Sequence, residues 1–139
     1  MVNKIIYMDK DSKQLCEQIM AQSNLNLVRI NGTDVQTKSD FFQLIEKELH
    51  FPGSCNNKFS AFDDWITDLS WYPQESGFCI CIEQSDTFLR EDEHFRKLLL
   101  SDFQEDILPF WEKDVLKYVK DGKPREFYLI ICDGWINPS

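Results

Sequence analysis

Glycine is scarce in this chain of 139 residues, and its five glycines are scattered rather than clustered. A phosphate-binding loop needs closely spaced glycines so that backbone N–H groups can approach the ligand. The chain also lacks a Gly-x-Ser-x-Gly elbow, and its two histidines, His50 and His94, are not placed beside a nucleophile. These absences argue against an enzyme, and we expect no cofactor.

Basic residues are also few: 15 Lys and Arg against 24 Asp and Glu give a net charge of -9. Such a surface repels nucleic acid and anionic membranes, and it suits either a soluble protein or one with a basic partner. No apolar run approaches the ~20 residues of a membrane span. The N-terminal stretch returns to charge at Asp9, too early for a signal peptide. We therefore expect a cytoplasmic protein that binds neither nucleic acid nor membrane.

The five cysteines are an odd number and include no Cys-x-x-Cys pair. They are Cys16, Cys55, Cys79, Cys81 and Cys132. Cys79 and Cys81 alternate within an apolar run, so both should point to one face of a strand. A chain of this length can build a core without disulfides. We expect buried free thiols and no metal site.

Four short apolar runs separated by helical patterns indicate an α/β fold with a mainly parallel sheet flanked by helices. The expected strands are residues 4–8, 25–30, 77–83 and 126–132. The expected helices are residues 12–22, 39–49, 59–69, 85–100 and 110–120. No linker divides the chain, so the pattern predicts one domain over residues 1–139, with the tail 133–139 unassigned.

Capping residues and prolines predict where these helices begin and end. The expected N-caps are Ser12, Ser39, Asn56 or Asn57, and Ser101 paired with Gln104 in a capping box. Pro109 should break or kink its helix near Leu108, because proline lacks the N–H and clashes with the preceding turn.

The stretch from 51 to 71 contains the most unusual helix. Its expected buried stripe is Phe59, Phe62, Ile66 and Leu69. The opposite side carries Ser60, Asp63, Asp64, Thr67 and Asp68. The three aspartates lie in the middle and end of the helix, where the helix dipole disfavours anions, and no Lys or Arg lies three or four residues away. This side is either a merely acidic solvent face or a surface that an outside cation compensates.

One enzyme-like pattern follows the first strand. Residues 8–11 (Met-Asp-Lys-Asp) resemble the acidic corner of response-regulator receiver domains, where carboxylates hold Mg²⁺. That family also needs an Asp ending a middle strand and a Lys ending a late one, whereas this chain has Glu83 and Asp133 there. A polar turn after a strand is the simpler interpretation.

Four short motifs occur in an order that resembles the barstar family of ribonuclease inhibitors. They are Ile30-Asn31-Gly32, Asp40-Phe41 opening a helix, Glu48-Leu49-His50-Phe51-Pro52, and Phe59-Ser60-Ala61-Phe62-Asp63-Asp64. The similarity covers roughly residues 25–132, and residues 1–24 look like an added strand and helix. The resemblance implies a small parallel sheet and an inhibitor that plugs the active site of a basic ribonuclease. The family's loop and acidic helix make this contact, with aspartates standing in for substrate phosphates.

The family's contact residues carry over to this chain in part. Its principal inhibitory Asp corresponds to Asp64, and the apolar residue opening its helix corresponds to Phe59. Ser60 stands where the family has a second Asp, and the loop has no aromatic residues but a cation, Lys58. The partner-binding surface that the resemblance implies is Asn56, Asn57, Phe59, Ser60, Asp63, Asp64, Thr67 and Asp68.

These departures favour a basic toxin other than barnase, bound 1:1 by a toxin-immunity protein. Two alternatives stay open: a barstar-fold binding module whose partner is not a nuclease, and an enzyme.

Overall fold

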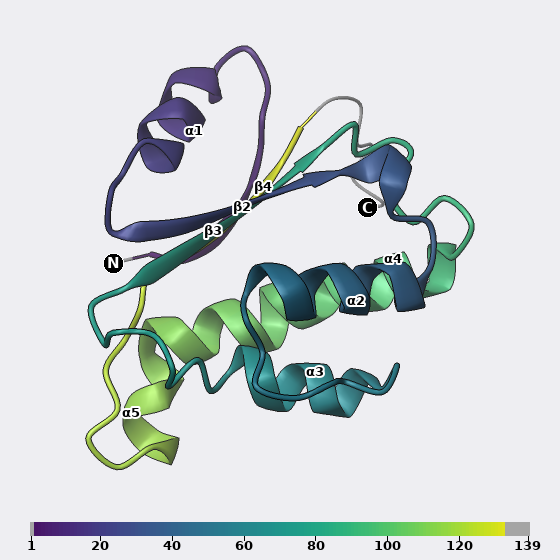
Figure 1. The fold of residues 1–139 in the computed structure, drawn as a ribbon. Helices are drawn as coiled ribbons and strands as arrows, with labels where there is room; N and C mark the ends of the chain where they lie inside the picture. Colours follow the sequence, from purple (N-terminus) through teal and green to yellow (C-terminus); the bar gives the residue numbers. More distant parts are fainter. Residues whose placement is uncertain (1, 133–139) are drawn as a thin grey trace.

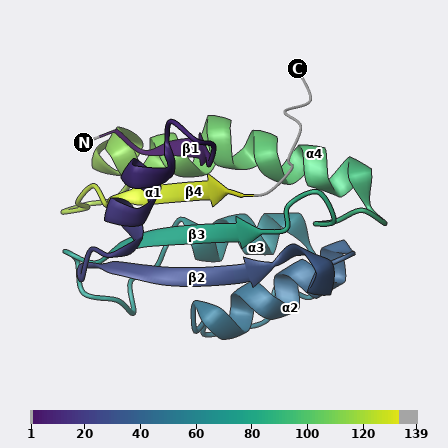
Figure 2. The ribbon, with the colours of Figure 1, turned by 90° about the horizontal axis from the view of Figure 1, so that it is seen from above.

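The computed structural model describes residues 2–132, which form a four-stranded parallel sheet with helices on both faces (Figure 1). The strands are β1 (Lys4–Tyr7), β2 (Leu25–Asn31), β3 (Gly77–Glu83) and β4 (Phe127–Ile131). Their order across the sheet is β1-β4-β3-β2, and each neighbouring pair is parallel (Figure 2). The predicted α/β fold and its parallel sheet are confirmed, and the added N-terminal strand extends the sheet beside β4.

Helices cover the two faces unequally (Figure 1). One face carries α1 (Lys13–Met20), and the other carries α2 (Lys38–Glu48), α3 (Phe59–Ile66) and a long helical segment. That segment consists of α4 (Glu93–Asp102), η2 (Phe103–Ile107), η3 (Phe110–Asp114) and α5 (Val115–Tyr118). A short 3₁₀ turn, η1 (Gly32–Asp34), follows β2. Within residues 2–132, no helix combines the length and apolar character that crossing a membrane requires.

The side chains of β3 point alternately to the two faces of the sheet and so contribute to two separate hydrophobic cores. Phe78, Ile80 and Ile82 face α2, α3 and α4 in the larger core, while Cys79 and Cys81 face α1 in the smaller one. Such a strand is apolar throughout because both sheet faces are covered. All five cysteines are buried free thiols.

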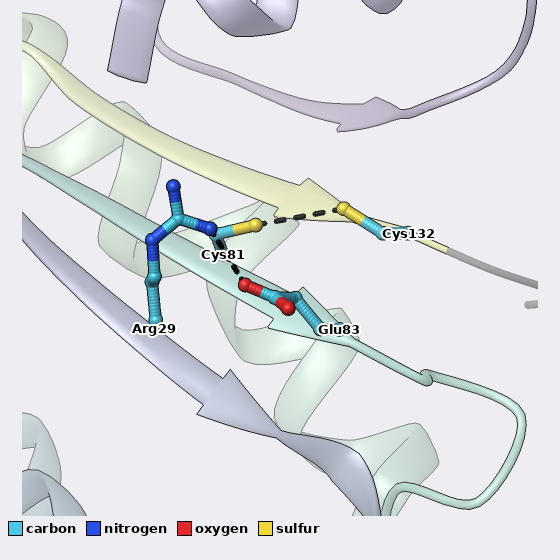
Figure 3. Close-up of polar contacts among 4 residues, drawn as sticks. All are labelled: Arg29, Cys81, Glu83 and Cys132. Atoms are coloured by element: carbon cyan, nitrogen blue, oxygen red, sulfur yellow. Dashed lines mark hydrogen bonds and ion pairs between the residues drawn. The ribbon is translucent and has the colours of Figure 1, made fainter. Parts of the chain in front are cut away.

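Polar groups lie near the carboxyl ends of the strands on the α1 side (Figure 3). Arg29 Nη1 lies 2.6 Å from Glu83 Oε1, and both side chains are about half exposed, so this pair contributes little to stability. Cys81 Sγ lies 3.5 Å from Cys132 Sγ. Burial, together with Cys132, raises the pKa of the Cys81 thiol, which therefore stays neutral and unreactive.

The first turn of α2 corrects one predicted cap. Thr37, not Ser39, is the N-cap: its Oγ1 accepts the N–H of Asp40 at 3.2 Å. The Asp40 carboxylate accepts the N–H of Thr37 in return, at 3.3 Å. The box forms two residues earlier than expected because Thr37 has an acidic residue three positions later, whereas Ser39 does not.

The helix predicted over 85–100 begins only at Glu93, after a series of turns. Asp92 is its N-cap and accepts a backbone N–H of the first helical turn. Ser101 lies inside α4 and Gln104 inside η2, so the predicted capping box at this point is wrong. The helix does not stop there because its apolar face continues into the core beyond Ser101.

Pro109 does not break the long helix. It has helical dihedral angles (φ -64°, ψ -34°) and lies between two π-helical segments, η2 and η3. A π-helical turn is wider than an α-helical one, which leaves room for the proline ring beside the preceding turn. Ile107, Leu108 and Trp111 are buried around it. Of the predicted break or kink, the break does not occur: core packing keeps the helix continuous, with π-helical segments on both sides of Pro109.

Residues 8–11 form the polar turn that was the simpler interpretation of this stretch. Asp9 Oδ1 accepts the N–H groups of Asp11 and Ser12 at 2.9 and 2.8 Å. Ser12 is the N-cap of α1 by position, but its hydroxyl accepts the Asp9 N–H rather than one from the helix. The Asp9 carboxylate therefore stabilises a backbone turn.

Candidate protein-binding surface

Hydrogen bonds from α2 shape the loop that precedes α3. Glu46 Oε1 accepts the N–H of Cys55 at 2.6 Å and the hydroxyl of Ser54 at 3.3 Å. Ser54 Oγ in turn accepts the N–H of Asn56 at 3.0 Å, and the Cys55 side chain is fully buried. The loop therefore presents its outer residues from a backbone that is already ordered.

Asn56 and Asn57 have a conformational role rather than the predicted capping role. Their φ angles are 52° and 58°, in the left-handed region that asparagine tolerates better than most residues. Lys58 occupies the N-cap position of α3, without a side-chain hydrogen bond to the helix. Both asparagines are exposed and so available to a partner.

Aromatic packing fixes the orientation of α3. Phe62 is fully buried, with its ring centroid 5.4 Å from that of Phe42 and 6.4 Å from that of Phe103. Phe59 is half-buried and packs on Phe42 and on Phe95 of α4, with a centroid distance of 5.5 Å to Phe95. Ile66 and Leu69 are also fully buried, so the predicted apolar stripe is confirmed.

The segment that follows α3 is tied to the end of the long helix. Trp111 Nε1 donates to the carbonyl of Ile66 at 2.9 Å. The buried Arg125 guanidinium donates to the carbonyls of Leu69, Tyr72, Pro73 and Ser76. Burial lowers the pKa of Arg125, an effect that the nearby Glu75 and Asp68 oppose. Arg125 was not among the predicted site residues; the available sequence signal is a cation two residues before a buried strand.

The outer side of α3 and the residues just after it are acidic, and the buried Arg125 acts electrostatically on Asp68 without forming a salt bridge. Asp64 and Asp68 are exposed, together with Ser60. Within residues 2–132, no Lys or Arg lies within 4 Å of the carboxylates of Asp63, Asp64 or Asp68. Thr67 is half-buried, and its hydroxyl donates to the carbonyl of Asp63 at 2.6 Å. The outer face therefore presents carboxylates that the described chain leaves without a salt bridge.

Asp63 differs from the other two aspartates because its side chain turns toward the long helix. Its Oδ1 is buried, and its carboxyl lies within hydrogen-bonding reach of Asp102 on α4. Asp102 is only 8% exposed and also lies within hydrogen-bonding reach of Asp106. The helix predicted over 59–69 ends at Ile66, so Asp68 lies in the turn after it. The predicted polar face is thus divided: Asp64 and Asp68 face solvent, and Asp63 faces other carboxyl groups.

Crowding among these carboxyl groups changes their protonation. Burial, Asp63 and Asp106 raise the pKa of Asp102 to about 9, so it carries a proton at neutral pH. Burial also raises the pKa of Asp63. Asp102 was not among the predicted site residues, because it lies outside the acidic helix on which that prediction rested. The available signal was its spacing: Asp102 follows Phe95 and Leu99 on the buried stripe of α4.

An open groove of about 390 Å³ lies between α3 and the long helix. The residues lining it are Phe59, Asp63, Leu98, Ser101, Asp102 and Asp106. Within residues 2–132, no group of three or more Asp, Glu, His or Cys side chains is arranged to hold a metal ion. The lining of the groove combines three carboxyl groups with two apolar side chains, Phe59 and Leu98.

A protein-family model described as Barstar (barnase inhibitor) matches residues 25–131. The chain belongs to the barstar family. The match runs from the start of β2 to the end of β4, so it includes α3 and the long helix and leaves out β1 and α1. No curated protein and no solved structure gives a significant match.

The barstar family is one of inhibitors rather than enzymes, and it binds ribonucleases. In this barstar-family chain the eight residues predicted to contact a partner lie along one continuous stretch: the loop, α3 and the two residues that follow it, Thr67 and Asp68. Asn56, Asn57, Ser60, Asp64 and Asp68 are exposed, and Phe59, Asp63 and Thr67 are half-buried.

Proposed function

We propose that this protein is a cytoplasmic immunity protein that neutralises a basic toxin, a ribonuclease, by covering its active site with the loop and α3. The observation that carries the proposal is the acidic face of α3, whose carboxylates form no salt bridge within residues 2–132, in a chain of the barstar family. Carboxylates at fixed positions can replace the phosphates that a nuclease cleft binds through Arg and Lys.

The ordering of the surface supports binding without large rearrangement. The loop is hydrogen-bonded to Glu46, and α3 is packed through Phe59 and Phe62. A pre-ordered surface loses little conformational entropy on association, which favours high affinity. The proposed contact is 1:1, with Asp64 at its centre and Asn56, Asn57, Ser60 and Asp68 around it.

Two departures from the family direct the proposal away from barnase as the target. Ser60 replaces a carboxylate, and Lys58 places an exposed cation beside the acidic face. A cation there repels a strongly basic cleft. We therefore propose a different basic ribonuclease. Its active-site cleft would contact Asp64 and Asp68 and would not require a carboxylate at position 60.

The test is capture of the partner from cells that encode the chain, followed by an activity assay on the purified partner. We expect a basic protein whose RNA cleavage falls to background at a 1:1 molar ratio with this chain, and much less with Asp64→Ala. A partner without nuclease activity would instead support the alternative binding module. A nuclease that stays active at a large excess of the chain would contradict the proposal.

A further inference from the structure

We propose that the end of the long helix and the turn after it, residues 113–123, bind reversibly to the surface of an anionic lipid bilayer. We call this segment the helix tip, and it contains none of the eight residues predicted to contact a toxin. The net charge of -9 by itself predicts repulsion from such a surface. The charge is unevenly distributed along the chain, however, and the helix tip reverses its sign locally.

Exposed apolar side chains gather at the helix tip. Leu116 is 62% exposed, Tyr118 is 77% exposed and Val119 is 45% exposed. These three are half of the large hydrophobic side chains that are exposed in the described part of the chain. Single exposed apolar residues are normal on a folded protein, whereas a group of them marks a binding surface.

Lysines are interspersed with these apolar side chains. Residues 113–123 contain two aspartates and four exposed lysines, which are Lys113, Lys117, Lys120 and Lys123. Elsewhere in the chain, acidic residues outnumber basic ones about twofold. Within residues 2–132, none of the four lysines forms a salt bridge. Their charges are therefore available to an anionic partner.

Backbone hydrogen bonds hold the helix tip in a defined shape. The N–H of Val119 donates to the Val115 carbonyl at 3.0 Å, and the N–H of Gly122 donates to the Val119 carbonyl at 3.0 Å. A Cβ at Gly122 would lie 2.9 Å from Val115 Cγ2 and from Val119 Cβ, so this turn needs glycine. The N–H of Arg125 then donates to the Trp111 carbonyl at 2.8 Å. The exposed apolar side chains are thus presented by a folded turn.

The position of the helix tip favours a flat partner. Figure 1 shows α5 and the turn after it at one end of the molecule, away from the sheet. A projecting end can contact a flat surface, whereas peptides and small ligands bind in grooves and pockets. At a bilayer, the three apolar side chains would enter the region between headgroups and acyl chains. The lysines would lie at the level of the lipid phosphates.

The direct test is co-flotation of the intact chain with unilamellar vesicles of phosphatidylglycerol and phosphatidylethanolamine. Vesicles of phosphatidylcholine serve as the neutral control. We expect saturable binding to the anionic vesicles and little binding to the neutral ones. The affinity for anionic vesicles should fall on the order of tenfold between low and high salt, because salt screens the attraction between lysines and headgroups.

A fluorescent label distinguishes insertion from loose adsorption. The five native cysteines are buried, so the NBD fluorophore can be attached to a cysteine introduced by Val119→Cys. We expect its emission to shift to the blue on anionic vesicles and to be quenched by nitroxide-labelled lipids. The same label attached after Leu15→Cys, at an exposed position on α1, should show neither effect.

Paired variants test the apolar part of the contact. Leu116→Ser combined with Tyr118→Ser should weaken vesicle binding about tenfold, because less apolar surface leaves water. Leu15→Ser removes an exposed apolar side chain from α1 and should leave vesicle binding unchanged. Thermal unfolding checks that each variant is folded.

A second pair of variants tests the charge. Lys117→Glu combined with Lys120→Glu should weaken vesicle binding by at least about tenfold. Lys10→Glu combined with Lys13→Glu changes the net charge by the same amount, also at exposed positions, but away from the helix tip. This control should have a much smaller effect.

Three results would overturn the inference: no saturable binding to anionic vesicles at low salt, an equal loss of binding in the Lys10 and Lys13 control, or no response of the label at position 119. Binding to single-stranded RNA or polyglutamate without binding to vesicles would assign the helix tip to another kind of anionic partner and would also overturn it. None of these experiments involves a toxin, so the membrane contact and the proposed function can fail independently.

Discussion

Asp64 is the residue whose removal should separate binding from folding. It is exposed on α3, and no Lys or Arg within residues 2–132 lies within 4 Å of it. In a complex, its carboxylate would meet a desolvated Arg or Lys, and truncation would leave that cation unpaired at a cost of roughly 2–5 kcal/mol. The helix itself should lose nothing, because an anion in its second half opposes the dipole.

We therefore expect Asp64→Ala to weaken toxin binding on the order of a hundredfold. The melting temperature should be unchanged or slightly higher. Calorimetry and thermal unfolding check the two parts. If the variant bound with wild-type affinity, α3 would not lie at the centre of the interface.

Asp102 should make the stability of the protein depend on pH. Its folded-state pKa of about 9 lies far above the value of about 3.9 for an unfolded Asp. The folded state therefore holds an extra proton between these values. This group's contribution to stability is greatest below about pH 4 and is lost as the pH rises through about 9.

Replacing Asp102 by Asn should remove this dependence, because the amide mimics the protonated carboxyl. We expect Asp102→Asn to raise the free energy of unfolding at pH 9 by on the order of 1–3 kcal/mol and to change it little at pH 4. Urea unfolding of both proteins at several pH values measures the difference. The same pH slope in wild type and variant would contradict the assigned protonation, and Glu105→Gln serves as the exposed control.

At the scale of elements, Arg125 connects the α3–β3 segment to η3 of the long helix. Its guanidinium reaches four carbonyls and lies 5.2 Å from the ring centroid of Trp111. Lysine keeps the charge but cannot supply the same planar set of donors. Carbonyls left without donors in a buried site cost free energy.

We expect Arg125→Lys to lower the free energy of unfolding by roughly 2–4 kcal/mol. Urea denaturation measures it, with the exposed Arg90→Lys as the matched control. If the two variants were equally stable, the hydrogen bonds from Arg125 to the four carbonyls would not stabilise the α3–β3 segment.

At the scale of the whole molecule, the net charge of -9 should steer a basic partner toward it. Long-range attraction acts on the encounter, and salt screens it over about 10 Å at 0.1 M. We expect the association rate constant to fall on the order of tenfold between low and high salt, with a much smaller change in dissociation. Stopped-flow mixing across a salt series measures both. A salt-independent association rate would show that the acidic surface does not guide binding.

Burial in the two hydrophobic cores should also protect every thiol from alkylation and oxidation. Burial raises the pKa values of Cys55 and Cys79 to about 12, so their reactive thiolate forms are rare at neutral pH. We expect slow alkylation of the folded chain and five alkylated cysteines after unfolding without reductant. Intact-mass spectrometry measures both. A disulfide-containing species at full yield would contradict this prediction.

Local sequence alone was enough to predict the strands and the apolar stripe of α3. Continuous apolar runs such as Gly77–Glu83 specify strands covered on both faces, and the helical spacing of Phe59, Phe62 and Ile66 specifies one buried side. Both patterns depend on side-chain periods of two and 3.6 residues, which act within a single element. The order of short motifs was enough to identify the family.

Only the tertiary structure decided how polar and helix-breaking residues are used. Asp63 lies beside Asp102 because α3 packs against α4 through Phe59 and Phe95, and Pro109 stays helical because π-turns and a buried face accommodate it. Arg125 is a structural anchor because four carbonyls from another segment converge on it. These outcomes depend on partners distant in sequence, and local periodicity carries no information about which segments will meet.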